Sequence, residues 1–333
     1  MIKVFYTSSE NKNYFGVNQV LSSLKKFLYK KTLIYNTGGF YKFLSNKYDL
    51  IHIHGCWKIR LFVYFLFSKF RNIKIVISPH GMLDPHSLKN KKLIKIVFWH
   101  FCQKIIFLLS DQIIVNSILE KKNVLKMIKH NNIKIIPHGI KLELLNHKNK
   151  RLKKNPLKFV FFSKIHPSKN LLGLINLWTN KNFLKNLDLS IYGEITDNQY
   201  FEKISKKISK FKNIKYHGAL YKNKVKILSN YDVFIFPSKS ENFGLVVLEA
   251  LASGLYIIID KKLSWGNLKK LGFASLITFT GNSLTKEIKN IDRVKLQIRG
   301  KNYIKKTRYF LKKKHNWNII SSNYLNSYKN LTN

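Results

Sequence analysis

Residues 232–259, DVFIFPSKSENFGLVVLEALASGLYIII, contain a strand, a loop, a helix and a second strand in succession. The runs Asp232–Phe236 and Tyr256–Ile259 are short and continuously apolar, which is typical of strands buried on both faces. Leu245–Ser253 between them has the composition of a buried helix, and Gly254 is a suitable residue to end it. This strand–helix–strand unit predicts a parallel α/β sheet.

The same alternation continues on both sides of this stretch and predicts a doubly wound α/β protein. Further strands are expected at Ile2–Tyr6, Thr32–Tyr35, Asp49–His54, Ile73–Ser78, Gln112–Val115, Ile133–Ile136, Lys158–Ser163, Leu187–Tyr192 and Asn213–His217. Helices are expected at Val17–Lys30, Trp57–Phe70, Ser117–Ile128 and Asn170–Trp178.

A polar, lysine-rich segment at residues 146–156 interrupts the alternation and predicts a linker between two domains. We expect an N-terminal domain at 1–150 and a C-terminal domain at 157–316. Residues 298–331 are expected to be helical with a break near His315–Asn316. The last helix, at about 317–331, is expected to pack back on the first domain.

The composition leaves several classes of protein open. The 333 residues include 61 Lys and Arg against 16 Asp and Glu, which gives a formal net charge of +45. Such a charge fits proteins that bind nucleic acid, an anionic membrane surface or phosphorylated substrates. A general bias toward Lys, Asn and Ile explains it equally well, because the lysines do not gather in one tail. Neither an aromatic-basic RNA-binding pattern nor a zinc-finger spacing nor a helix-turn-helix signature supports nucleic-acid binding.

The sequence predicts a cytoplasmic protein. Two cysteines, Cys56 and Cys102, are too few for a disulfide framework and indicate a reducing compartment. The first residues lack the long apolar centre of a signal peptide. The most apolar region, residues 91–118, is interrupted by charges and does not predict a membrane-spanning helix. Within it, Lys89–Lys104 fits either a helix on a membrane surface or a helix with one core face and one solvated lysine face.

Two lysines follow the first strand of the second half. Strand Lys158–Ser163 runs into SKIHPSKN, and a helix is expected to start near Pro167–Asn170. A helix N-terminus presents unpaired N–H groups and a partial positive charge. Lys164 and Lys169 beside it form a candidate diphosphate site, and two solvated lysines are the alternative. Gly193, which follows the next strand, allows a ligand or another backbone segment to approach closely.

Two glutamates flank the start of the helix in the opening stretch. Glu241 is expected in the loop before the helix, and Glu249 is expected inside it between Leu248 and Ala250. A carboxylate in apolar surroundings needs hydrogen-bond donors, which the hydroxyl groups of a ligand can supply. The alternative is a helix-start acid and an ordinary helical glutamate.

Residues 237–254, PSKSENFGLVVLEALASG, resemble the E-x7-E motif of family 4 glycosyltransferases, the group 1 glycosyltransferases, which use nucleotide-sugar donors with retention. Residues 163–170 resemble the phosphate segment G-R-x4-K-G of that family, with Ser, Lys and Asn replacing Gly, Arg and the final Gly. In the first half, residues 49–57 (DLIHIHGCW) and 77–85 (ISPHGMLDP) resemble acceptor-domain segments of bacterial polysaccharide glycosyltransferases, and residues 134–140 (KIIPHGI) resemble I-P-N-G-I.

The resemblance implies the GT-B fold, in which two Rossmann-like doubly wound domains face each other across a cleft. It implies that Glu249 binds the donor ribose, that Glu241 binds the donor sugar, and that Lys164 and Lys169 stabilise the departing diphosphate. The residues implied to bind the donor are Gly16, Lys164, Lys169, Gly193, Glu241, Asn242, Phe243, Gly244, Leu245 and Glu249. His80, Glu241, Lys164 and Lys169 are implied to take part in catalysis, His80 near the donor sugar.

Neither a metal nor a cofactor is expected, since the nucleotide sugar is a substrate and no Asp-x-Asp triplet occurs in the sequence. His52 and His54 lie two residues apart on an expected strand and face the same side, as a metal pair would. Cys56 follows the expected end of this strand at Gly55, and no fourth ligand is evident.

The expected function is transfer of a sugar from a UDP- or GDP-sugar to a lipid-linked glycan in O-antigen, capsule or exopolysaccharide synthesis. The expected location is the cytoplasmic face of the cell membrane, and the sequence gives no oligomeric state. The rivals are another GT-B enzyme, such as a nucleotide-sugar 2-epimerase, and a basic nucleic-acid-binding protein. The paired glutamates with the lysine segment favour transfer.

Overall fold

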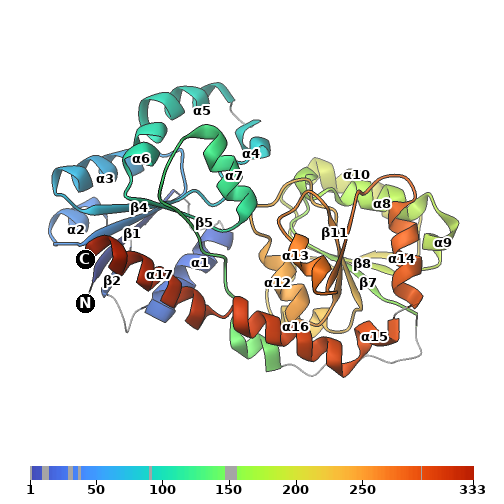
Figure 1. Ribbon diagram of the computed structural model, residues 1–333. Helices are drawn as coiled ribbons and strands as arrows, with labels where there is room; N and C mark the ends of the chain where they lie inside the picture. The colour runs from blue at the N-terminus through green and yellow to red at the C-terminus, as the bar shows by residue number, and fades with distance from the viewer. Residues whose placement is uncertain are drawn as a thin grey trace. The chain divides into compact units, whose positions relative to one another are not determined.

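The computed structural model describes residues 2–9, 15–28, 33–36, 39–89, 92–146, 156–293 and 295–333. The chain forms two compact units, each around its own sheet (Figure 1). The first unit comprises Met1–Gly139 and Lys314–Asn333, and the second comprises Ile140–Lys313.

The first unit contains a parallel six-stranded sheet in the order β2-β1-β3-β4-β5-β6. Its strands are β1 (Lys3–Ser8), β2 (Leu33–Asn36), β3 (Leu50–His54), β4 (Lys74–Ser78), β5 (Gln112–Val115) and β6 (Ile133–Ile135). Every residue of β3 and of β5 is buried. This agrees with continuous apolar runs, because a parallel sheet is covered on both faces.

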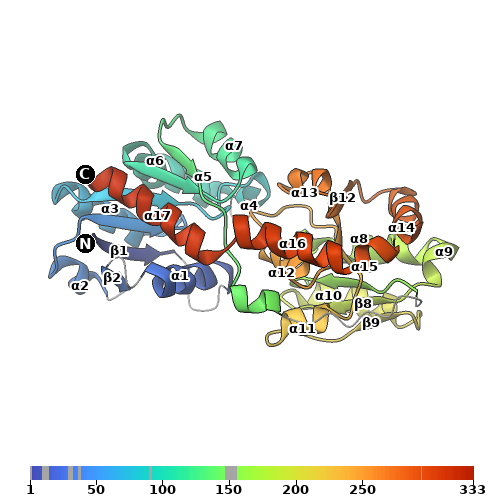
Figure 2. The ribbon, with the colours of Figure 1, turned by 60° about the horizontal axis from the view of Figure 1, so that its bottom comes forward.

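Two sets of helices cover this sheet. They are α1 (Phe15–Leu28), α2 (Phe40–Leu44), α3 (Ile59–Phe70), α4 (Pro85–Lys89), α5 (Lys92–Phe98), α6 (Lys104–Leu109), α7 (Ile118–Met127) and α17 (Trp317–Thr332), with one π-helical segment, η1 (Trp99–Gln103), joining α5 to α6. Val4 and Tyr6 of β1 pack with residues of α1 and α17, whereas Phe5 packs with residues of α3. The chain end therefore forms part of the first unit, where α17 lies beside α1 (Figure 2).

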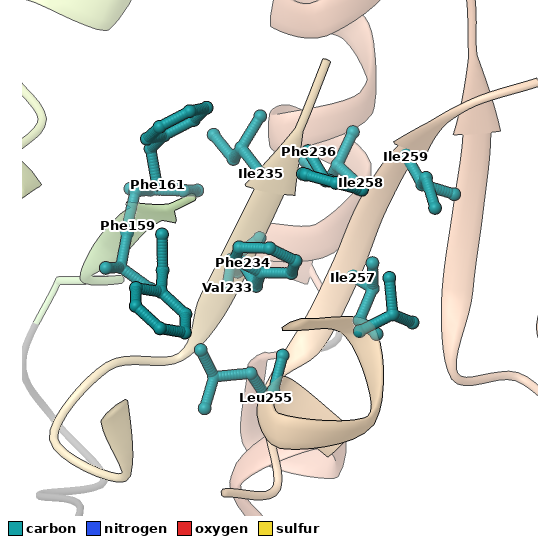
Figure 3. Packing of buried hydrophobic residues seen from close by; sticks show 14 of the residues in the cluster. Phe159, Phe161, Val233, Phe234, Ile235, Phe236, Leu255, Ile257, Ile258 and Ile259 are labelled. Atoms are coloured by element: carbon teal, nitrogen blue, oxygen red, sulfur yellow. The ribbon is translucent and has the colours of Figure 1, made fainter. Parts of the chain in front are cut away.

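The second unit contains a parallel sheet in the order β12-β11-β10-β7-β8-β9. Its strands are β7 (Phe159–Phe162), β8 (Leu189–Tyr192), β9 (Ile214–Tyr216), β10 (Val233–Phe236), β11 (Tyr256–Asp260) and β12 (Ala274–Ile277). Figure 3 shows side chains of β7, β10 and β11 packed along the middle of this sheet. All four residues of β7 and of β10 are buried.

The helices of the second unit follow its strands along the chain. They are the 3-10 segments η2 (Leu142–Asn146) and η3 (Pro167–Lys169), and α8 (Leu171–Thr179), α9 (Asn182–Lys185), α10 (Asn198–Ile208), α11 (Lys224–Leu228), α12 (Leu245–Ala252), α13 (Gly266–Lys270), α14 (Ser283–Arg293), α15 (Lys295–Arg299) and α16 (Lys301–Lys314).

The expected secondary structure is confirmed for the most part. Every expected strand is present with ends that shift by one or two residues, and the break near His315–Asn316 separates α16 from α17. Strand β12 was not expected, because Ala274 and Ser275 give it a weak strand signal. The expected linker lies mainly at residues 147–155, outside the described residues.

Each sheet has one point at which the order of its strands reverses. In the first unit the chain passes from β1 to β2 on one side and then to β3 on the other, and in the second unit it passes from β7 to β8 and later to β10. The connections that follow β1 and β3 in the first sheet, and β7 and β10 in the second, therefore diverge to opposite faces of their sheet. The crevice that this leaves at the strands' carboxyl ends is the usual ligand site of such sheets.

A buried ion pair joins the entry to β10 with the helix α15. Arg299 Nε and Nη2 donate to Asp232 Oδ1 and Oδ2 at 2.8 and 2.7 Å, and both side chains are 3% exposed. The amide of Lys158 also donates to Asp232 Oδ2, at 2.9 Å, and Arg299 Nη2 also donates to the carbonyl of Pro156, at 3.0 Å. The hydrogen bond that Arg299 donates to Asp232 raises the pKa of Arg299. The pair thus holds the starts of β7 and β10 together.

Replacing Arg299 with Met should destabilise the second unit strongly. The change leaves the Asp232 carboxylate buried without its cation, which typically costs about 3–5 kcal/mol. Urea unfolding of the full chain measures the loss in each variant. The matched control is Lys74→Met, which removes the 3.4 Å pair with Asp111. Lys74 is half-exposed, so the control should lose less than about 1 kcal/mol. Equal losses in the two variants would contradict the prediction.

Candidate functional site

The connection from β10 to α12 carries most of the predicted donor-binding residues. Glu241 and Asn242 lie in the loop and are partly exposed, and Gly244 caps the helix with φ of 80°, a conformation that favours glycine. The carbonyl of Phe243 accepts a hydrogen bond from Trp265 Nε1 at 2.7 Å, and the two rings lie 5.0 Å apart. The turn before Leu245, the first residue of α12, is therefore fixed by the core.

A second connection, from β7 to α8, is bonded to the first. His166 caps η3 by accepting from the amide of Ser168 at 3.2 Å. The carbonyl of Ser168 accepts from the amide of Lys239 at 2.9 Å and from Ser238 Oγ at 3.3 Å. These bonds hold the two loops together at the point where the strand order reverses.

Lys169 and Glu241 form an ion pair across these two loops. Lys169 Nζ lies 2.6 Å from Glu241 Oε2, and both side chains are about four-fifths buried. The sequence assigned these residues to neighbouring parts of one ligand, and the structure brings them into direct contact. A ligand that binds here therefore meets an ammonium whose position is fixed by a carboxylate.

Glu249 has a partner that the sequence did not predict. Lys224 Nζ of α11 donates to Glu249 Oε1 at 3.1 Å and lies 5.4 Å from the ring centre of Phe162, at the end of β7. Burial raises the pKa of Glu249, and the ammonium of Lys224 opposes this rise. No described residue donates to Glu249 Oε2, so one carboxylate oxygen is available to accept from a ligand.

Other predicted residues occupy separate places. Lys164 is exposed and lies directly after Ser163, which follows the last residue of β7. Gly193 is required by backbone packing, because a Cβ there would lie 1.8 Å from the carbonyl oxygen of Ser163. Of the two explanations for this glycine, the approach of another backbone segment is therefore confirmed. Gly16 lies in the first turn of α1, and residues 10–14 before it lie outside the described residues.

His80 belongs to the first unit and lies in the loop after β4. It adopts φ of 52°, in the left-handed region. Its Nε2 lies 2.7 Å from Nδ1 of the buried His54, and its ring stacks on that of His138. Burial lowers the pKa of His80 to about 4, so its imidazole is neutral at pH 7. The predicted role of His80 near the donor sugar stays a prediction.

Glu120 holds the His80 loop in place. Its Oε1 accepts from the amide of Gly81 at 2.5 Å and its Oε2 accepts from the amide of Asn116 at 2.6 Å. Burial raises the pKa of Glu120 to about 7, although both amide hydrogen bonds oppose the rise. The sequence offered one signal for this residue, since Ser117-x-x-Glu120 is a helix-capping pattern.

The histidines of β3 take part in a hydrogen-bond network. His52 Nδ1 contacts the hydroxyl of Tyr328 at 2.7 Å, and His52 Nε2 contacts Ser78 Oγ at 2.9 Å. Tyr328 in turn contacts the hydroxyl of Tyr6 at 3.0 Å. Both ring nitrogens of His52 thus have partners, Nδ1 in α17 through Tyr328 and Nε2 in β4 through Ser78. Among the residues that the structure describes, no cluster of three metal-ligand side chains was found.

Two family models match the chain in succession. Glycosyltransferase Family 4 matches residues 9–144, and Glycosyl transferases group 1 matches residues 144–265. The chain belongs to the group 1 glycosyltransferases. The second model includes the loops that hold Lys169 and Glu241, and the first includes the His80 loop.

Several known proteins are similar to this glycosyltransferase. A protein of Klebsiella pneumoniae described as an uncharacterized 41.2 kDa protein in the cps region is 28% identical over 239 residues, which are 66% of this chain and 62% of that protein. The match thus spans less than two thirds of the relative's length.

Solved structures share the whole fold. HepE from Anabaena in complex with UDP and glucose has a TM-score of 0.72 at 15% identity, covering 99% of this chain and 100% of that one. Sucrose-phosphate synthase from Thermosynechococcus elongatus has a TM-score of 0.75 at 16% identity, covering 99% and 98%. WaaG, a glycosyltransferase involved in lipopolysaccharide biosynthesis, has a TM-score of 0.62 at 12% identity, covering 99% and 100%. At these identities the likeness shows the fold, which is GT-B.

The stability of the first unit should fall as the pH is lowered from 7 to 5. Burial lowers the pKa of His80 to about 4 and places those of His52, His54 and His138 well below the ordinary value of 6.5. Unfolding below pH 6.5 therefore takes up protons that the folded unit excludes. Glu120, whose pKa is raised to about 7, acts in the opposite direction but is a single group.

Melting temperatures measured at pH 7 and pH 5 check this prediction. His80→Gln should make the loss smaller, because it removes one of the groups that titrate only after unfolding. His100→Gln, at an exposed position outside the network, should leave the loss unchanged. A wild-type melting temperature that rises between pH 7 and pH 5 would show the opposite sign.

Proposed function

We propose that this glycosyltransferase moves a sugar from a UDP- or GDP-sugar, with retention, to a lipid-linked glycan during surface-polysaccharide synthesis. The observation that carries the proposal is the Lys169–Glu241 ion pair at the start of α12, where the strand order of the second sheet reverses. A cation beside a helix N-terminus suits a diphosphate. A neighbouring carboxylate suits sugar hydroxyls.

The proposed donor position follows from three anchors. The diphosphate meets the N–H groups of Phe243, Gly244 and Leu245, to which the positive φ of Gly244 gives access. Glu249 Oε2 accepts from the ribose hydroxyls while Lys224 holds the other carboxylate oxygen. Glu241 accepts from the hydroxyls of the donor sugar. HepE, whose structure contains UDP and glucose, supports a nucleotide-sugar donor through its shared fold.

The proposed chemistry is electrostatic. As the bond between sugar and diphosphate breaks, negative charge develops on the leaving oxygen, and fixed cations lower the energy of that state. Lys169 is oriented for this task by Glu241, and Lys164 adds a second positive charge on the same loop. The chain's own lysines and the helix N-terminus neutralise the charge, and no covalent nucleophile is proposed.

The proposed acceptor is a lipid-linked glycan presented at the cytoplasmic face of a membrane. Two findings support this choice: the relative in a cps region and the fold shared with a lipopolysaccharide glycosyltransferase. Within the described residues, no helix is long and apolar enough to cross a bilayer. The high positive charge and the apolar helix α5 favour contact with an anionic membrane surface.

Nucleotide binding should depend on Glu249 and Lys224. UDP or GDP should raise the melting temperature of the wild type, and Glu249→Gln should remove most of that rise. Lys224→Met should reduce it, because the buried carboxylate then shifts toward its neutral form. Lys226→Met, an exposed position on the same helix, is the control and should bind normally. The absence of a shift with either nucleotide, together with a shift on adding RNA, would favour a nucleic-acid-binding protein.

Loss of the Lys169 ammonium should lower the turnover number kcat more than it lowers the affinity for the donor. Lys169→Met should lower kcat by about 10²–10³, the usual cost of losing one fixed charge-stabilising group. Hydrolysis and transfer over a panel of nucleotide sugars, read by mass spectrometry, measure this. Lys239→Met removes an exposed charge from the neighbouring loop and should leave kcat within about twofold of wild type. Equal effects of the two variants would contradict the role given to Lys169.

A further inference from the structure

The first unit contains a cavity of about 620 Å³, a size typical of small-molecule sites. Its walls come from the loops after β3 and β4 and from α4, α5, η1, α6 and α7. The helices α4 to α7 are drawn above the first sheet in Figure 1. Most of the lining is apolar or aromatic. The lining residues are Trp57, Leu83, Pro85, Leu88, Lys95, Ile96, Trp99, His100, Lys104, Asn123, Lys126 and Met127.

One wall of the cavity is held in a strained but well-supported position. Trp57 adopts φ of 66°, in the left-handed region that bulky residues avoid. Its amide donates to Oε1 of the buried Gln103 at 3.0 Å, and Gln103 lies in the π-helical segment η1. Lys95 Nζ lies 5.6 Å from the centre of the Trp57 ring. The strain is therefore compensated by contacts that keep the Trp57 ring at the cavity wall.

The cavity adjoins the His80 loop. Leu83, which lines it, is three residues after His80, and Asn123, Lys126 and Met127 lie on the helix whose first turn contains Glu120. Glu120 holds the amide of Gly81, so the loop and the cavity share one rigid wall. A ligand in the cavity thus lies beside a segment that the family resemblance assigns to the reaction.

The charged residues of the lining are all positive. Lys95, Lys104 and Lys126 are present, and no lining residue is acidic. No ion pair between described residues includes Lys104 or Lys126. Lysine donates hydrogen bonds but does not accept them. Three ammonium groups without a carboxylate suit an anionic group, so a phosphate on an apolar chain fits both the lysines and the walls.

The surface beside the cavity is apolar as well. Leu93 and Phe101 are 80% and 72% exposed, and Ile94 and Val97 of the same helical segment are also exposed. Ile96 both lines the cavity and is exposed. The apolar lining is therefore continuous with an exposed apolar helix face, as expected where a chain enters from a lipid layer.

We propose that this cavity binds the lipid stem of the acceptor, with the apolar chain between Trp57, Ile96 and Trp99 and its phosphate at Lys104 and Lys126. The inference rests on the proposed function and deepens it by naming the acceptor-stem site. It predicts a ligand that carries both parts, because neither an apolar chain nor a phosphate alone uses the whole lining.

Farnesyl diphosphate is the probe for this site. The full chain is titrated with it, and binding is followed by the fluorescence of its tryptophans, of which Trp57 and Trp99 line the cavity. Farnesol and inorganic diphosphate are titrated separately, and each should bind at least about tenfold more weakly than the complete probe. The thermal shift with UDP or GDP is measured on the same samples.

Paired variants locate the binding. The double variant Lys104→Glu and Lys126→Glu should lower the affinity for farnesyl diphosphate by about tenfold or more, because it reverses the charge that faces the phosphate. Lys121→Glu with Lys122→Glu makes the same charge change on α7 outside the lining and should have little effect. Ile96→Glu should weaken binding of the probe, whereas Ile118→Glu, at an exposed apolar position of α7 outside the lining, should not.

Three outcomes would overturn the inference. They are no saturable binding, equal weakening by the control pair, and full competition by inorganic diphosphate. Binding to anionic vesicles without binding of farnesyl diphosphate would also overturn it in favour of a membrane-surface contact. If the nucleotide shift persists in these cases, the acceptor-stem site fails alone. If the nucleotide shift is absent as well, the proposed function fails with it.

Discussion

The carbonyl of Ser168 accepts hydrogen bonds from Lys239 and Ser238, and the geometry of the donor-site candidate depends on this clamp. The loops after β7 and β10 start side by side at the carboxyl ends of adjacent parallel strands and then lead to opposite faces of the sheet. The clamp holds them, so Lys169 and Glu241 can form a short ion pair. Behind it, Asp232 and Arg299 fix the opposite ends of the same two strands. The site is thus preorganised from the sheet upward.

The sequence predicted the fold well because it depends on patterns that are local. Continuous apolar runs gave the strands, and the Gly254 and Asn316 positions gave helix ends. The edge strand β12 was not predicted, because its burial comes from tertiary packing rather than from its own composition. The motif residues Glu241 and Glu249 were placed correctly before and inside α12, because their secondary structure follows from the same local signals.

Partners across the fold were beyond such patterns. Lys224 is one lysine among many, and only the folding of α11 against α12 brings it to Glu249. Glu120 reaches Gly81 from a helix that is distant in sequence. The capping pattern places Glu120 at the start of its helix but does not reveal its contact with Gly81. For Gly193 the sequence left two explanations open, and the carbonyl oxygen of Ser163, 1.8 Å from where a Cβ would lie, identifies the close backbone contact.

The excess of positive charge gives the few carboxylates particular weight. Among the described residues, Asp232, Glu241 and Glu249 each pair with a cation, and Glu120 accepts from two amides. A general lysine bias explains the many solvated lysines, but it does not explain an exposed helix face that is apolar. Leu93, Ile94, Val97 and Phe101 lie on one helical segment of a chain in which lysine is readily used at surfaces. Composition and fold stability alone leave these side chains unexplained, whereas contact with an apolar ligand or lipid would give them a physical role.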